Sequence, residues 1–96
     1  MYAVVRRYSA EPSNLEEIRR RVDEEFLPIV SQTRGFVSYY ALDDGSGDLV
    51  TVSVFLSKEG AEESTYQAKA WIQENSSLIP QAKDIVGGEV FSHGGQ

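Results

Sequence analysis

The sequence predicts an α+β domain whose elements follow the order β-α-β-β-α-β, and three observations predict it. Alternating stretches rich in Val, Tyr and Phe predict strands over residues 2–8, 36–42, 49–56 and 84–93. Apolar residues at spacings of three and four predict amphipathic helices over residues 15–30 and 59–72. A length of 96 residues fits a single domain spanning residues 1–96. The order is that of a ferredoxin-like fold, with both helices on one side of a four-stranded antiparallel sheet.

Start and stop signals support the first helix. Ser13 and Glu16 have the spacing of a capping box, in which each side chain satisfies a free backbone N–H. Pro28 falls inside the apolar pattern and is expected to kink or loosen the last turn, because it removes a backbone donor. Gly35 is the expected helix stop. The apolar stripe comprises Leu15, Ile18, Val22, Phe26, Ile29 and Val30.

The later elements follow the same logic. Residues 43–48 are Asp, Gly and Ser and predict a turn that returns the chain as a hairpin. Ser57 is the expected N-cap of the second helix, and Pro80 ends that helix or its continuation. In the last strand, Gly87 and Gly88 indicate a bulge or a close backbone approach.

The predicted sheet has too many apolar side chains for one face to meet water. Aromatic residues lie on all four strands, and odd and even positions both carry bulk, so aromatics remain on the face away from the helices. An exposed apolar face of that size is normally covered. A second copy of the sheet is the simplest cover, which predicts a two-fold homodimer.

Composition excludes several classes of partner and site. Nine Lys and Arg against 15 Asp and Glu give a net charge of −6, which argues against nucleic acid and anionic membranes as partners. The absence of Cys excludes disulfides, a thiol nucleophile and thiolate metal sites. No apolar run is long enough to span a bilayer, and no signal peptide is recognisable, so a cytoplasmic protein is expected.

The acidic turn at residues 43–48 resembles a metal loop only superficially. A calcium loop needs a Glu eleven residues after its first Asp, and those positions hold Val54 and Phe55. We therefore expect a solvated turn and no metal site. His93 is the one side chain with an ordinary pKa near neutrality, which makes it the default proton-transfer candidate, although it lies close to the end of the sequence.

Two further features favour a ligand pocket. Trp71 lies on the second helix with Tyr66 about one turn before it, a spacing typical of core packing and also of a pocket for a flat ligand. Arg6 and Arg7 are neighbours on a strand, so their side chains point to opposite faces. The inward one needs a carboxylate or a ligand oxygen, and the sequence does not say which of the two it is.

Four segments together resemble the antibiotic biosynthesis monooxygenase-like domains of the dimeric α+β barrel superfamily. They are Tyr2-Ala-Val-Val-Arg-Arg-Tyr8, Phe26-Leu-Pro-Ile-Val30, Arg34-Gly-Phe-Val-Ser-Tyr-Tyr40 and Ala70-Trp-Ile72. The resemblance covers nearly the whole chain, and the pair Gly35-Phe36 is its most specific part. It implies a homodimer in which two sheets pack into a barrel, with a pocket between the helices and the sheet of each protomer.

The resemblance also implies two kinds of chemistry, of which one fits this sequence. Haem-degrading relatives use an Asn on the first strand, a Trp on the second helix and a His near the end of that helix. Here the strand offers Arg6 and Arg7, and the helix has no His, which argues against haem. Cofactor-free relatives oxidise quinols or polyphenols by binding an electron-rich phenol in a dry pocket that orients it and supplies a base.

Two hypotheses follow. In the first, the protein is a cofactor-independent monooxygenase whose catalytic candidates are Trp71, Arg6, Arg7 and Asn75. The ligand-binding candidates are Tyr39, Tyr40, Tyr66, Phe26 and His93. In the second, it is a non-catalytic dimeric module that binds a small molecule or is associated with stress, and Trp71 packs in the core.

Overall fold

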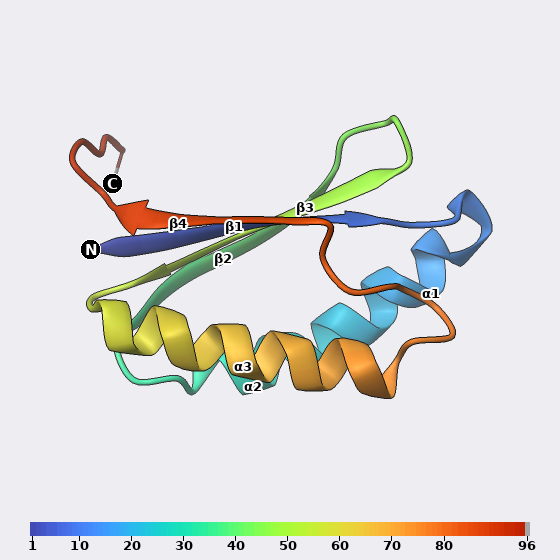
Figure 1. Cartoon of the computed structure of the whole chain (residues 1–96), viewed down its shortest axis with the longest axis horizontal. Coiled ribbons are helices and arrows are strands. Elements are labelled where there is room, and N and C mark those ends of the chain that lie inside the picture. The colour runs from blue at the N-terminus through green and yellow to red at the C-terminus, as the bar shows by residue number, and fades with distance from the viewer. Residues whose placement is uncertain (96) are drawn as a thin grey trace.

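A computed structural model of the chain, which describes residues 1–95, contains the predicted order of elements (Figure 1). The strands are β1 (Tyr2–Ser9), β2 (Phe36–Asp43), β3 (Asp48–Phe55) and β4 (Asp84–Glu89). The helices are α1 (Leu15–Arg21), α2 (Leu27–Ser31) and α3 (Lys58–Glu74), with a 3₁₀ turn at Pro12–Asn14 and a π-helical turn at Val22–Phe26. In the described part of the chain, no helix has the length and apolarity needed to cross a membrane.

The four strands form one antiparallel sheet in the order β2-β3-β1-β4, and all the helices lie on one side of it (Figure 1). This is the ferredoxin-like α+β fold that the sequence predicts. Because residues directly opposite one another in antiparallel strands share a face, the register assigns the sides of the sheet. Val4, Arg6 and Tyr8 face the helices, together with Ser53 and Phe55.

The first helical segment is less regular than its pattern suggests. The capping box at Ser13 does not form, because the chain enters the helix through the 3₁₀ turn and Asn14 occupies the N-cap without a side-chain cap. Pro28 lies in the first turn of α2, which continues directly from the π-helical turn. The irregularity lies just before it, where the N–H of Leu27 bonds to the carbonyl of Val22. Such π-helical turns often occur at functional sites.

Gly35 does not stop the helix, since α2 already ends at Ser31. It adopts a φ of 77° in the loop to β2, and its carbonyl accepts a hydrogen bond from the N–H of Leu56. A β-bulge follows at Val37, because Phe36 pairs with Phe55 while Ser38 pairs with Val54.

The last strand is shorter than predicted. β4 ends at Glu89, so His93 lies beyond it and is exposed. The sequence predicts either a bulge or a close backbone approach at Gly87 and Gly88. Both residues pair with β1 without a shift in register, so there is no bulge at these positions. The close approach holds for Gly87, where an added Cβ would lie 3.3 Å from Cε1 of the Tyr2 ring.

The outer face of the sheet is open and apolar. Tyr40 is 65% exposed and Val86 60% exposed, and the half-buried Val50, Val52 and Val54 lie between them on the same face. Arg7 is the charged side chain that β1 places among them. Nothing covers this face within residues 1–95, and a contiguous apolar patch of this kind is typical of an interaction surface.

Gly60 predicts a measurable packing constraint at the start of α3. A Cβ there would lie 2.5 Å from the backbone carbonyl oxygen of Arg34, a contact that requires the backbone to shift. We expect Gly60→Ala to destabilise the fold by about 1–3 kcal/mol, despite the higher helix propensity of Ala, when measured by urea unfolding. Gly88→Ala is the control, since nothing lies within 4 Å of its added Cβ, and an equal loss in both variants would contradict this account.

Candidate functional site

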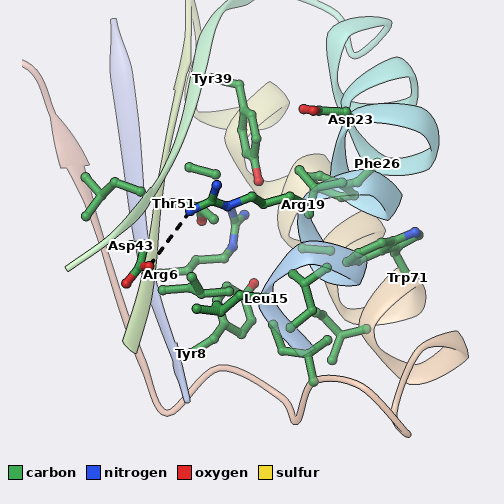
Figure 2. A pocket seen from close by; sticks show the side chains of 18 residues that line it. Arg6, Tyr8, Leu15, Arg19, Asp23, Phe26, Tyr39, Asp43, Thr51 and Trp71 are labelled. Atoms are coloured by element: carbon green, nitrogen blue, oxygen red, sulfur yellow. Dashed lines mark ion pairs between the residues drawn. The ribbon is translucent and has the colours of Figure 1, made fainter. Parts of the chain in front are cut away.

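A cavity of about 300 Å³ lies between the sheet and the helices (Figure 2). Strands β1, β2 and β3 form one wall, and the segment from α1 through the π-helical turn forms another, with α3 between them. Most of its lining is apolar or aromatic, and the polar groups are few. Its labelled lining residues in Figure 2 are Arg6, Tyr8, Leu15, Arg19, Asp23, Phe26, Tyr39, Asp43, Thr51 and Trp71.

The structure assigns the inward arginine as Arg6, which is only 1% exposed. One of its terminal nitrogens donates to Oγ of Ser53 at 3.3 Å. The other donates to Oγ of Ser64 at 3.1 Å and to Oγ1 of Thr65 at 2.8 Å. Both hydroxyls on α3 donate in turn to the carbonyl of Ala61, which leaves their lone pairs free for Arg6.

Arg6 has no carboxylate partner among residues 1–95, and its Nε has no hydrogen-bond partner there. Burial lowers the pKa of its guanidinium, because removal from water disfavours the charged form. An arginine nevertheless stays protonated in a protein. The cavity wall therefore carries a buried positive charge whose direct hydrogen-bond partners are hydroxyl groups.

Three aromatic rings pack in series beside it. The ring of Phe26 lies 5.6 Å from that of Tyr39 and 5.6 Å from that of Trp71, centroid to centroid, and both pairs are tilted. The indole N–H of Trp71 donates to a carboxylate oxygen of Glu25 at 3.0 Å, which fixes the orientation of the ring. Phe26 and Glu25 both lie in the π-helical turn, so that turn positions two sides of the cavity.

The phenols of Tyr8 and Tyr39 remain hydrogen-bond donors. Burial raises the pKa of both hydroxyls above the ordinary range, and the positive charge of Arg6 only partly opposes this. Figure 2 shows the Tyr39 hydroxyl pointing into the cavity. Neither tyrosine is therefore suited to act as a base at neutral pH.

The cavity also contains charged groups that sequence reasoning missed. Arg19 extends from α1 to Asp43 at the end of β2, with 3.9 Å between Nη2 and Oδ2 (Figure 2). Asp23 lines the same cavity from the π-helical turn. The sequence carried a signal for Arg19 and Asp23. Arg19 follows Ile18 and Asp23 follows Val22, so both residues lie at the edge of the apolar stripe that faces the cavity.

Five of the sequence candidates lie outside this cavity's wall. Arg7 is on the outer face of β1 and forms ion pairs with Asp44 at 3.3 Å and Asp48 at 3.1 Å. Tyr40 lies on the outer face of the sheet, and Tyr66 is 75% exposed on α3. His93 lies beyond β4, and Asn75 is buried behind Trp71. The candidates that the structure brings together are Arg6, Phe26, Tyr39 and Trp71.

Asn75 has a structural position instead. Its side-chain nitrogen donates to the carbonyl of Trp71 at 2.8 Å, and its oxygen accepts a bond from Arg21 at 2.7 Å. It thus ties the end of α3 to α1. Within residues 1–95, no three His, Asp or Glu side chains cluster so as to hold a metal ion.

Comparison with solved structures identifies the fold. A protein of unknown function from Nitrosomonas europaea superposes with a TM-score of 0.79 at 18% identity, covering 99% of this chain and 93% of the other. A protein from Chloroflexus aurantiacus, provisionally described as an antibiotic biosynthesis monooxygenase, gives 0.70 at 19% identity over 97% and 96% of the two chains. One from Deinococcus radiodurans with the same description gives 0.72 at 14% identity over 100% and 98%.

The chain has an antibiotic biosynthesis monooxygenase-like fold. No family model matches the sequence, and no curated protein does either. The predicted resemblance is therefore confirmed by the shape of the chain. At these identities the likeness concerns the fold alone.

Asn75 offers a test of how this monooxygenase-like fold holds its Trp71. We expect Asn75→Ala to destabilise the fold by about 1–3 kcal/mol in urea unfolding, because a buried hydrogen-bonding group is lost and Arg21 loses its partner. Asn75→Asp keeps an acceptor for Arg21 and should lose less. If Ala and Asp are equally mild, the two bonds do not support the end of α3.

Proposed function

We propose that the protein is a cofactor-independent monooxygenase acting on a small aromatic substrate of the quinol or polyphenol kind. The observation that carries this proposal is the cavity of about 300 Å³, in which packed aromatic rings face a buried guanidinium. Such a site can hold a flat ring, exclude water and stabilise negative charge on a phenol oxygen. Solved structures of the same fold with that provisional description support the same reaction class.

The reaction needs no external reductant because the substrate supplies the electrons. Within this class, the step requires a substrate with a hydrogen on the ring carbon opposite one hydroxyl, and the substrate loses that O–H hydrogen and that C–H hydrogen. One atom of dioxygen becomes the carbonyl oxygen of the quinone, and the other leaves as water. The enzyme's task is then to orient the ring and to ionise the phenol, since the phenolate gives up an electron to oxygen more readily.

Asp23 is the proposed proton acceptor. It lines the cavity, and the other lining carboxylate, Asp43, is engaged by Arg19. Figure 2 shows Asp23 at the same end of the cavity as Tyr39, and its carboxylate is exposed to solvent. Arg6 would stabilise the phenolate that forms, and the rings of Phe26 and Trp71 would hold the substrate ring.

A second candidate function is a non-catalytic module that binds a small aromatic molecule. Two catalytic candidates favour it, because their polar atoms are already engaged. The N–H of Trp71 is bonded to Glu25, and the amide of Asn75 is bonded to Arg21 and to the Trp71 carbonyl. In this case the cavity would bind the ligand without oxidising it.

Oxygen consumption with 1-naphthol distinguishes the two functions. The monooxygenase should consume one dioxygen per 1,4-naphthoquinone formed, with no hydrogen peroxide released. Asp23→Asn should lower the rate by about 10²–10⁴-fold, the usual contribution of a general base. Glu24→Gln, at the neighbouring exposed carboxylate, should leave the rate unchanged. Binding of 1-naphthol without oxygen uptake would establish the second function and contradict the first.

We also propose that the outer face of the sheet is covered by a second copy of the chain. The exposed Val5, Tyr40, Leu42 and Val86 lie on this face and would be buried in a two-fold dimer. We expect sizing to give twice the 10.7 kDa mass, and Val86→Glu to reduce it to the monomer. Ile29→Glu changes an exposed apolar residue on α2, and a shift to monomer there as well would contradict the assignment to the sheet.

A further inference from the structure

A second cavity, of about 480 Å³, lies on the other side of Arg6. It is bounded by α3, the start of β4 and the segment that joins them. Arg6, Tyr8 and Ala68 line both cavities, so the buried guanidinium lies in their common wall.

The charge of this second cavity is unlike that of the molecule as a whole. Arg6 and Lys69 line it, whereas none of its described lining residues is an Asp or a Glu. The chain carries a net charge of −6, so a region with two cations and no carboxylate stands out against its surroundings. The other residues there with polar side-chain groups are neutral, namely Tyr8, Thr65, Gln73 and Gln81.

Arg6 itself lacks one interaction that its burial would normally require. Its three partners are hydroxyls, and its Nε, which is buried, has no acceptor among residues 1–95. Burying a charge is costly unless it is both paired and hydrogen-bonded. A fixed positive charge with a free N–H beside two cavities is complementary to an anionic oxygen of a ligand.

We propose that the physiological ligand is an aromatic anion whose charged oxygen binds Arg6 in the wall shared by the two cavities. The inference rests on the proposed function, in which the first cavity holds the aromatic ring. The charged oxygen belongs to a carboxylate or to an ionised phenol. Arg6 is then the residue that selects for charge, and Lys69 adds a weaker, longer-range attraction.

Matched probes test the charge requirement without any turnover. Calorimetric titration should show 2-naphthoate binding about 10- to 100-fold more tightly than 2-naphthamide, because a hydrogen bond to a charged group contributes that much. The two probes share a ring system and differ in charge. Arg6→Met should remove the difference, since Met fills similar space without charge. Lys69→Met should reduce it only slightly.

Arg34→Met serves as the control for lost positive charge. Arg34 is exposed and lines neither cavity, so the preference for naphthoate should be unchanged in that variant. The unfolding of Arg6→Met must be measured alongside, and we expect stability equal to the wild type or higher, because an uncompensated buried charge is removed. If this variant does not fold, the comparison of the two probes on the wild-type protein still decides the question.

Each result has a separate meaning. Equal affinity for naphthoate and naphthamide in the wild type, together with an unchanged pKa of a bound phenol, overturns the charge requirement and leaves the aromatic cavity standing. Failure of both probes to bind overturns this inference and the proposed function together. A preference that survives Arg6→Met overturns the assignment to Arg6.

A coloured phenol separates the two sources of the charged oxygen. Absorbance titration of 4-nitrophenol reports its ionisation directly, because only the phenolate is yellow. If ionised phenols are ligands, the pKa of the bound phenol should fall in the wild-type protein and return to its free value in Arg6→Met. Naphthoate selectivity with no such fall assigns the oxygen to a carboxylate, and a fall without naphthoate selectivity assigns it to a phenol.

Discussion

The buried guanidinium of Arg6 is the constraint around which the structure is arranged. It joins three elements, because it starts on β1 and donates to a hydroxyl on β3 and to two hydroxyls on α3. The residues under α3 are correspondingly small and polar, and Ser53 and Ser64 are both fully buried. A charge in this position limits how closely the helix can pack on the sheet and leaves cavities on both of its sides. The same group that organises the core thus also provides a binding determinant.

The aromatic wall has a separate origin in the irregular first helix. In a regular helix over residues 15–30, Phe26 would point in a different direction relative to Ile18. The π-helical turn changes that direction because it inserts an extra residue into the hydrogen-bond ladder. That turn buries Phe26 and brings Glu25 to the indole of Trp71. The local irregularity therefore determines that Phe26 is the side chain that meets Tyr39 on the sheet, with 5.6 Å between the two ring centroids.

Periodicity was sufficient to predict the fold but only part of the site. Strand alternation and the apolar stripe gave the order of elements, and the register then required one of Arg6 and Arg7 to face inward. The inward arginine is identified only by the strand register, in which Arg6 pairs with Thr51 and Ile85. That register forms between distant segments of the chain. Tyr66 precedes Trp71 by five residues, which is about 140° away from it around a helix, and it therefore points to solvent instead of sharing the buried face of Trp71. Helical spacing marks Asp23 as a residue at the edge of the apolar stripe, whereas Asp43 becomes a cavity residue only because α1 brings Arg19 to the end of β2, which no local pattern encodes.

A crystal structure of the protein with 2-naphthoate would test the central claim most directly. The naphthalene ring is expected in the first cavity, against the wall formed by Phe26, Tyr39 and Trp71, with a carboxylate oxygen within hydrogen-bond distance of Nε of Arg6. That oxygen would satisfy the one buried side-chain donor that lacks a partner in the described chain. A carboxylate directed to solvent, or a ligand bound elsewhere with the Nε of Arg6 still unpaired, would contradict it.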